Sequence, residues 1–346
     1  MRRPQIRRDS SPLAPSTAVC LGAFDGLHLG HRALIERARG HAEHVALVTF
    51  DPHPQRVLAP DRPLRLLLTA EQRERTAAAL GIDALVLLPF DAALARVSAE
   101  DFVRDHLARL APTAIVVGTD FRFGAGRRGD AAMLQALLPS HGIAVEVVEP
   151  VESGPVLNPS APQHKLSSSA VRDAVVAGDV ARAHAMLGRP HAVIGTVVEG
   201  DRRGRTLGFP TANLETGPPR HAEAALLPAV GVYAVWLAPV PSPLRAPTEL
   251  VGPLPAVANL GTNPTFAGAR TPRLEVHVID RDLGDTLYGT TVEVWFVERL
   301  RDEIRFSGVD ALVAQIKLDI DSARARLGTA SDDGVLAPPM IGDPQQ

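Results

Sequence analysis

Five short apolar runs with many β-branched side chains alternate with helical segments over the first half of this 346-residue chain. The runs are apolar at consecutive positions, which indicates strands buried on both faces. Strands covered by helices on each side form parallel sheets, so the pattern predicts a doubly wound α/β domain. The expected strands are 17–22, 45–50, 84–90, 114–118 and 144–149, and the expected helices lie near 30–40, 70–80, 98–110 and 130–139.

The pattern changes in the second half. Residues 167–187 predict a serine-capped helix, a break at Gly178 and a second helix capped by Asp179. Short strands separated by turns follow, and RLEVHVID (273–280) alternates apolar and polar residues, which places its valines on one face. Strands at this spacing predict a small antiparallel β-barrel. A helix over 309–327 is expected to follow the last strand.

The domain boundaries are expected where these patterns change. A chain of this length can bury two cores. We expect a loose N-terminal arm at 1–17, the α/β domain at 18–188, the barrel domain at 189–328 and a disordered tail at 329–346. The proline-rich stretch 239–255 is interpreted as an insertion between two barrel strands.

Composition excludes several classes of protein. A formal net charge of −3 gives no overall basic field, so nucleic acid is not expected as a partner. Cys20 is the single cysteine, which rules out an internal disulfide and predicts an intracellular, cytoplasmic protein. Residues 224–244 are uncharged but contain four prolines, which favours a strand and loop over a membrane-spanning helix. The sequence leaves the oligomeric state open, a homo-oligomer included.

The stretch GAFDGLHLGH (22–31) joins the first expected strand to the first helix. In open parallel sheets this end of the strands binds ligands, and the free N–H groups of the helix favour an anion. His28 and His31 are three residues apart, so both rings can face one anion, while a tight turn with solvent-facing histidines is the alternative. The spacing fits neither a Walker A loop nor a dinucleotide fingerprint, and it lacks the i, i+4 histidines of a metalloprotease helix.

Three further segments stand at strand ends or helix starts: TFDPHP (49–54), GTDFRFGAGRRGD (118–130) and LSSSAVR (166–172). Each alone is ordinary turn chemistry. Together with GAFDGLHLGH they resemble the nucleotidyltransferase superfamily, and in particular the adenylyltransferase half of the bacterial bifunctional riboflavin kinase/FMN adenylyltransferases, or FAD synthetases.

That resemblance implies attack of the FMN phosphate on the α-phosphate of ATP, with release of pyrophosphate and without a protein nucleophile. His28 and His31 would be the catalytic residues, acting with the helix N-terminus and Mg²⁺ on the phosphate charge. The implied ATP-binding residues are Gly22, Phe24, Asp25, Gly30, Ser168, Ser169 and Arg172, and the implied FMN-binding candidates are Asp120, Phe121 and Arg127.

GTVVEGDRRGRTLGFPTANL (195–214) is a glycine-rich stretch followed by an extended segment. Thr211 and Asn213 are two apart, so their side chains face the same way in extended chain, and their oxygens are hard ligands of the kind Mg²⁺ prefers. The string resembles the riboflavin kinase signature. By that resemblance Glu275 is the general base that takes the ribityl 5′-hydroxyl proton, and without it Glu275 is an ordinary polar-face residue of an alternating strand. The implied phosphate loop contains Gly200, Gly204, Arg205, Thr206, Gly208 and Pro210.

The resemblance as a whole implies two consecutive ATP-dependent steps, riboflavin to FMN and FMN to FAD, with Mg²⁺ accompanying ATP and no tightly bound prosthetic group. The chain departs from the usual pattern at Arg32, Ser169 and His191, where glutamine, threonine and an aromatic residue are usual. Three alternatives stay open: a nucleotidyltransferase with another acceptor, an aminoacyl-tRNA synthetase, and a flavin-binding regulator without turnover.

Overall fold

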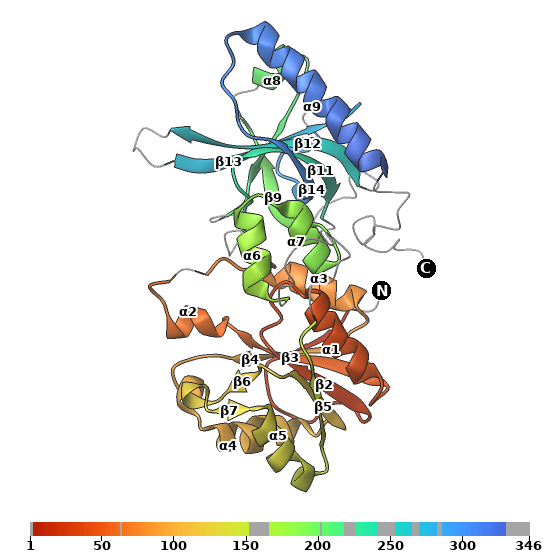
Figure 1. The fold of residues 1–346 in the computed structure, drawn as a ribbon, viewed down its shortest axis with the longest axis vertical. Helices are drawn as coiled ribbons and strands as arrows, with labels where there is room; N and C mark the ends of the chain where they lie inside the picture. Colours follow the sequence, from red (N-terminus) through yellow and green to blue (C-terminus); the bar gives the residue numbers. More distant parts are fainter. Residues whose placement is uncertain are drawn as a thin grey trace. The chain divides into compact units, whose positions relative to one another are not determined.

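The computed structural model describes residues 3–62, 64–151, 166–200, 203–217, 226–240, 253–264, 270–281 and 286–329 (Figure 1). The chain divides into two compact units, Met1–Ser168 and Ser169–Gln346. Two predicted features lie mainly outside the described residues: the tail, from residue 330 onward, and the proline-rich stretch, over 241–252.

The first unit is built on a six-stranded sheet in the order β1-β4-β3-β2-β5-β8, and every strand pair in it is parallel. This confirms the expected α/β fold. After β2 the chain adds β3 and then β4 on one side of β2, and it then adds β5 and β8 on the other side. The direction of winding therefore changes between β2 and β5, and ligands usually bind at this position in such sheets. The strands are β1 (Gln5–Arg7), β2 (Thr17–Leu21), β3 (His44–Asp51), β4 (Ala84–Pro89), β5 (Ala114–Gly118) and β8 (Ala144–Val148).

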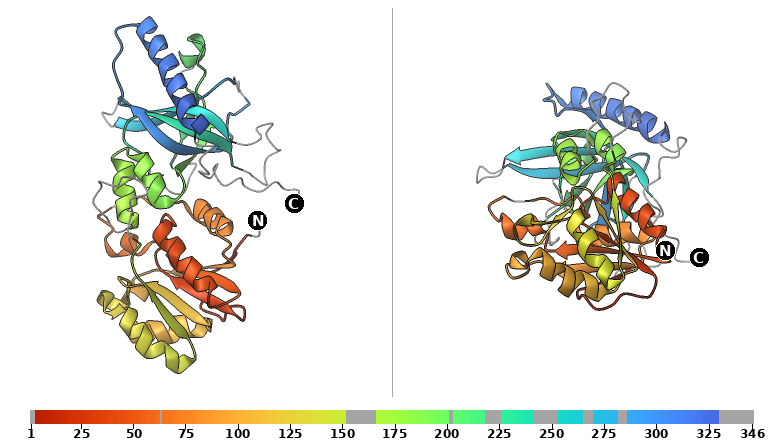
Figure 2. Two further views of the ribbon diagram at one scale, coloured as in Figure 1. Left: turned by 45° about the vertical axis from the view of Figure 1, so that its right-hand side comes forward. Right: turned by 60° about the horizontal axis from the view of Figure 1, so that its bottom comes forward.

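Helices cover both faces of this sheet (Figures 1 and 2). Along β2, Ala18 and Cys20 are buried toward α1 and α3, whereas Val19 and Leu21 are buried toward α4 and α5. This two-sided burial is why the strands are apolar at consecutive positions. The helices are α1 (Leu29–Arg39), α2 (Pro54–Leu58), α3 (Ala70–Ala79), α4 (Ala99–Phe102, continued by a π-turn at Val103–Leu107) and α5 (Ala131–Leu137), and a small ribbon pairs β6 (Arg122–Phe123) with β7 (Gly129–Asp130).

The N-terminal arm differs from the expected loose segment. Residues 5–7 form β1, which pairs in parallel with the edge strand β4, and Leu13 is buried in the core shared with α4 and α5. Edge pairing supplies the backbone hydrogen bonds that a short polar segment needs to become ordered. The expectation of a loose arm is therefore wrong for these residues.

The second unit contains a closed antiparallel barrel in the order β10-β13-β12-β11-β14-β9. Leu274, Val276 and Val278 belong to its core, as the alternation predicted, so Glu275 points away from that core. Helix α9 (Val309–Thr329) packs along the outside of the barrel (Figure 2). The strands are β9 (His191–Val198), β10 (Ala212–Glu215), β11 (Gly231–Pro239), β12 (Leu254–Pro264), β13 (Arg270–Val278) and β14 (Thr291–Arg301).

The helices α6 (Ser168–Val176) and α7 (Val180–Leu187) are grouped with the barrel, so the structural division falls before the expected boundary at residue 188. The reason is packing, because Val180 is fully buried in the barrel core. The predicted cap is present, since Asp179 Oδ1 accepts a hydrogen bond from the Arg182 N–H at 3.0 Å. Within the described ranges, no helix has the length and apolar character needed to cross a membrane.

We expect the buried His191 to make the stability of the barrel depend on pH. Burial lowers its pKa from 6.5 to about 4, and its Nε2 lies 2.8 Å from the Leu226 carbonyl oxygen. A folded-state pKa below the unfolded one means that the unfolded chain binds more protons as pH falls, so stability is lost between pH 6.5 and 4. We expect this group alone to remove about 3 kcal/mol across that window.

Urea unfolding across that pH range checks this expectation. His191→Phe should give a flatter dependence of unfolding free energy on pH than the unmodified chain. An identical dependence in the two proteins would assign the acid sensitivity to other groups.

Candidate functional site

The turn between β2 and α1 places two histidines at the start of the helix. His28 is the N-cap, and its Nδ1 accepts a hydrogen bond from the His31 N–H at 3.4 Å. The two rings stack with their centroids 3.7 Å apart and an interplanar angle of 16°. Because Nδ1 of His28 is an acceptor, the proton of the neutral ring lies on Nε2, which makes Nε2 a donor. The turn therefore combines an imidazole donor with the N–H groups of a helix start.

The same turn has an unusual backbone. Phe24 and Leu27 have positive φ angles of 48° and 44°, and both side chains are fully buried. Packing in the core holds these otherwise unfavourable conformations, which are enriched at functional sites. Phe24 also contacts the His31 ring edge-on, with the ring centroids 5.0 Å apart. Phe24 thus supports the histidine pair from behind.

Asp25 is tied to neighbouring segments. Its Oδ1 accepts a hydrogen bond from the Leu67 N–H at 2.9 Å, and its backbone carbonyl accepts one from Ser168 Oγ at 2.7 Å. The carboxylate is almost fully buried. Asp25 therefore fixes the turn and Ser168 relative to each other.

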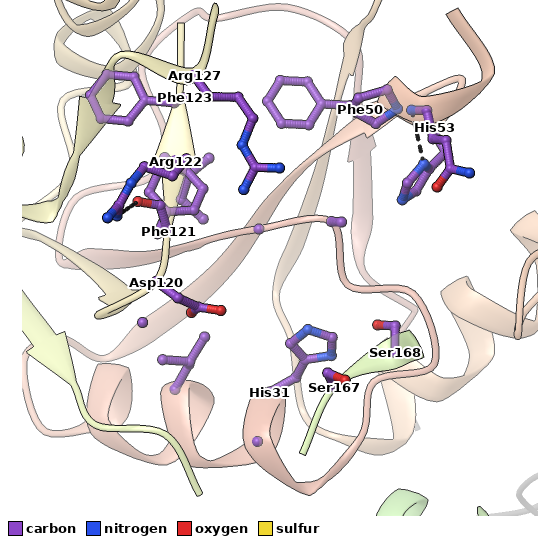
Figure 3. A pocket seen from close by; sticks show the side chains of 18 of the residues that line it. His31, Phe50, His53, Asp120, Phe121, Arg122, Phe123, Arg127, Ser167 and Ser168 are labelled. Atoms are coloured by element: carbon purple, nitrogen blue, oxygen red, sulfur yellow. Dashed lines mark hydrogen bonds between the residues drawn. The ribbon is translucent and has the colours of Figure 1, made fainter. Parts of the chain in front are cut away.

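A cavity of about 730 Å³ opens at the carboxyl ends of the parallel strands, within the usual size range of small-molecule sites (Figure 3). One part of its wall is polar and contains His28, His31 and Ser168. Another part is aromatic and contains Phe50, Phe90, Phe102, Phe121 and Phe123. In Figure 3 the guanidinium of Arg127 points into the space between the phenylalanines and His31. One cavity thus offers both a flat apolar surface and an anion site.

The cavity brings together most of the residues nominated in the first half of the chain. Its lining includes Gly22, His28, Gly30, His31, Asp120, Phe121, Arg127 and Ser168. Phe24 and Asp25 do not line it and lie behind the turn. Ser169 and Arg172 are on α6, in the second unit, where Arg172 Nη1 donates to Ser169 Oγ at 3.4 Å. Their role in ATP binding stays a prediction.

Several polar residues of the cavity wall were not among the predicted site residues, and His53 is one of them. It caps α2, with its Nδ1 accepting from the Gln55 N–H at 3.2 Å, so its neutral ring also carries the proton on Nε2. The signal was present, because TFDPHP (49–54) spans the carboxyl end of β3 and His53 lies just beyond it. Of the aromatic residues of the wall, Phe121 was among the predicted candidates, whereas Phe50, Phe90, Phe102 and Phe123 were not.

The barrel carries a second polar cluster on its outer face. Asn213 of β10 and Asn259 of β12 are both paired with Glu275 of β13 in the strand register. Arg273 Nε donates to Asn213 Oδ1 at 2.7 Å and lies 2.9 Å from Glu275 Oε1. Asn213 is 8% exposed, whereas the Glu275 side chain is 30% exposed. A carboxylate open to solvent and a fixed amide therefore stand side by side.

The glycine-rich segment lies against this cluster. A Cβ on Gly200 would come within 2.1 Å of Asn213 Nδ2, and a Cβ on Gly204 within 2.3 Å of the Phe209 carbonyl oxygen. Only glycine allows these approaches. The segment includes the short helix α8 (Arg203–Thr206), and Gly208 has a positive φ of 84°. The glycines thus let the backbone lie close to Asn213 at Gly200 and to Phe209 at Gly204.

A cavity of about 550 Å³ lies beside Phe209 and Pro210, under α9. His277 Nδ1 donates to the Pro210 carbonyl at 2.8 Å, and its ring meets Phe209 edge-on. The basic side chains of the lining are Arg205, Arg281, Lys317 and Arg324, and the acidic ones are Asp280 and Asp321. Of the predicted loop residues, Arg205, Gly208 and Pro210 line this cavity, whereas Gly200, Gly204 and Thr206 do not.

Across the described ranges, no group of three or more histidine, cysteine, aspartate or glutamate side chains gathers to hold a metal ion. The oxygens of Thr211 and Asn213 are hard donors that suit a magnesium ion sharing its ligands with phosphate.

One unit has a histidine pair at a helix start beside a cavity, and the other has a glycine-rich segment beside a cavity with basic residues. This combination is typical of a two-domain enzyme that binds nucleotides. Residues 11–160 match the family model of FAD synthetase, and residues 187–327 match that of riboflavin kinase. The bifunctional riboflavin kinase/FMN adenylyltransferase of Escherichia coli K12 is 37% identical over 319 residues, which cover 90% of this chain and 92% of that protein. The Bacillus subtilis enzyme of the same name is 31% identical over 313 residues, covering 89% and 91%. The chain belongs to the family of bifunctional riboflavin kinase/FMN adenylyltransferases.

A solved structure agrees with this assignment in fold. It is described as a macrolide-efflux protein from Streptococcus pneumoniae, is 31% identical, and has a TM-score of 0.77 over 93% of this chain and 99% of that chain. The name given to that structure differs from those of the sequence relatives. What the two chains share is the arrangement of the fold over nearly their whole length.

Proposed function

We propose that this chain phosphorylates riboflavin to FMN in its barrel unit and adenylylates FMN to FAD in its α/β unit, with ATP as the donor in both steps. The observation that carries the proposal is the first cavity, of about 730 Å³, which is lined both by phenylalanines and by a histidine pair at a helix start. A cytoplasmic location, where ATP is available, is part of this proposal.

In the adenylylation step, an oxygen of the FMN phosphate attacks the α-phosphorus of ATP, and the bond to pyrophosphate breaks. His28 and His31 stabilise the negative charge that develops on the α-phosphate, together with the N–H groups of the helix start. The phenylalanines stack against the isoalloxazine ring, and Arg127 neutralises phosphate charge.

In the kinase step, Glu275 takes the proton of the ribityl 5′-hydroxyl as its oxygen attacks the γ-phosphorus of ATP, and ADP leaves. Backbone N–H groups within residues 203–208 bind the phosphates. Thr211 and Asn213 would hold Mg²⁺, which supplies charge neutralisation on the phosphate oxygens when bound. The basic residues that line the second cavity support the proposal that the rest of the ATP molecule binds there.

Product analysis of the full chain tests the proposal. Incubation with riboflavin, ATP and Mg²⁺ should give FMN, then FAD, with ADP and pyrophosphate in matching amounts. Riboflavin that binds but stays unchanged would indicate a flavin-binding regulator. Consumption of ATP to pyrophosphate only when a different phosphorylated acceptor is supplied would indicate a nucleotidyltransferase of another specificity.

A further inference from the structure

One arginine of the barrel links the two groups assigned to kinase chemistry. Arg273 Nε lies 2.7 Å from Asn213 Oδ1 and 2.9 Å from Glu275 Oε1. The same nitrogen thus donates to the amide and forms an ion pair with the carboxylate. Neither the resemblance nor the proposed mechanism assigns any function to Arg273.

The strand register makes this link a consequence of the fold. Arg273 and Glu275 are two residues apart on β13, so both side chains stand on the same outer face. Asn213 of β10 is directly opposite Glu275. The Arg273 side chain is 26% exposed and Asn213 is 8% exposed, so solvent weakens the contact less than at an open surface.

The contact also determines the orientation of the Asn213 amide. Its Oδ1 faces Arg273, and its Nδ2 faces the backbone of Gly200, where an added Cβ would lie within 2.1 Å. The same Cβ would lie within 2.7 Å of Arg273 Nη2. A flipped amide would direct its NH₂ group at the guanidinium donors, which is unfavourable. Because an amide oxygen has two acceptor lone pairs, Oδ1 can keep Arg273 and still bind a cation.

We propose that Arg273 is a positioning residue of the kinase reaction, which sets the Glu275 carboxylate and the Asn213 amide in the geometry that the substrates need. The proposal rests on the proposed kinase function of the barrel. Arg273 acts through its two partners and does not touch the reacting atoms. A planar guanidinium suits this role because it presents several donors in a fixed geometry.

A purely structural ion pair is the competing explanation, and it predicts a different set of effects. If the pair is purely structural, its loss should change neither the kinase kcat nor the Mg²⁺-dependent part of nucleotide binding. Because the pair is partly exposed, its loss should also change stability little. A positioning role predicts that the kinase step and the Mg²⁺-dependent part of nucleotide binding change together, while folding and adenylylation do not.

The test compares Arg273→Gln and Arg273→Lys with a matched control, Arg326→Gln. Arg326 lies on α9, where it pairs with Glu298 at 3.4 Å outside both cavities. For each full-length protein, four quantities are measured: kcat for riboflavin phosphorylation, calorimetric affinity for ADP with and without Mg²⁺, the rate of FMN adenylylation, and the thermal midpoint.

Arg273→Gln should lower the kinase kcat by about 10- to 100-fold, the usual effect of removing a group that orients a ligand or base. It should also reduce the gain in ADP affinity that Mg²⁺ provides. Arg273→Lys should restore part of both, because an ammonium group can contact either partner but lacks the planar fork. Adenylylation and the thermal midpoint should stay near those of the unmodified chain, and Arg326→Gln should change none of the four.

Two results would overturn the proposal: a kinase kcat in Arg273→Gln equal to that of the unmodified chain, or a loss matched by an equal loss of adenylylation and thermal stability. An unmodified chain that makes no FMN contradicts the proposed function instead. In that case the Mg²⁺ dependence of ADP binding still decides whether Arg273 orients Asn213.

Discussion

Glu275→Gln is expected to stop FMN formation from riboflavin while FAD formation from supplied FMN continues. Glutamine has nearly the shape of glutamate but cannot accept the 5′-hydroxyl proton, so the loss in kcat should be about 100- to 10,000-fold. Glu275 stands on the outer face of β13, paired in register with Asn213 and Asn259, so the substitution leaves the barrel core untouched. Chromatography of flavin products from riboflavin or FMN, each supplied with ATP, measures both steps in one protein.

Glu298→Gln is the matched control for this substitution. Glu298 also lies on the barrel, on β14, where it pairs with Arg326 and lines neither cavity. It should leave both steps unchanged. A Glu275→Gln protein that forms FMN at the usual rate would remove the general base from the mechanism. Loss of both steps in a folded Glu275→Gln protein would contradict the separation of the two activities.

Much of the fold could be predicted because the buried positions of a helix or strand are occupied by apolar residues, and these recur in the sequence with a regular pattern. The strands of the parallel sheet are apolar on both faces, as in β2, and β13 alternates because only one of its faces lies in the barrel core. The exceptions are short elements. β1 has three residues and β10 has four, so each is defined by its pairing partner and not by its own composition.

The candidate site shows a similar division. His28 and His31 could be nominated because they are close in sequence, and one helix start brings them together. Phe50 and His53 lie in the same cavity but come from a different strand end, and only the folded sheet shows that they face the histidines. Asp25 shows another limit of the sequence: its carboxylate accepts a hydrogen bond from the Leu67 N–H, a contact that the turn motif does not reveal, and its role in ATP binding stays a prediction.

Arg273 could not have been nominated from the sequence, because its importance depends on contacts between strands. It precedes Glu275 by two residues in an alternating strand, where an arginine is an ordinary exposed residue. Its bond to Asn213 crosses from β13 to β10, over a separation of 60 residues. Local patterns predict which face a side chain occupies, but partners on neighbouring strands follow only from the register.

His28→Ala is expected to abolish FAD formation while riboflavin phosphorylation continues, which is the reverse of the effect at Glu275. Removing one preorganised donor from a developing phosphate charge should lower the adenylylation kcat by about 100- to 1,000-fold. His28 also caps α1, however, so alanine removes a structural hydrogen bond as well as a catalytic group. Loss of a cap alone destabilises a protein by about 1 kcal/mol.

His28→Asn separates these two effects, because asparagine is a good N-cap residue but lacks the imidazole donor. We expect His28→Asn to recover the thermal midpoint lost in His28→Ala and to stay equally defective in making FAD. His44→Asn is the control, since His44 lies at the start of β3 beside Asp83 and outside the cavity lining. A His28→Asn protein that made FAD at the rate of the unmodified chain would show that His28 acts only by capping the helix, and it would leave His31 and the helix N–H groups to stabilise the α-phosphate.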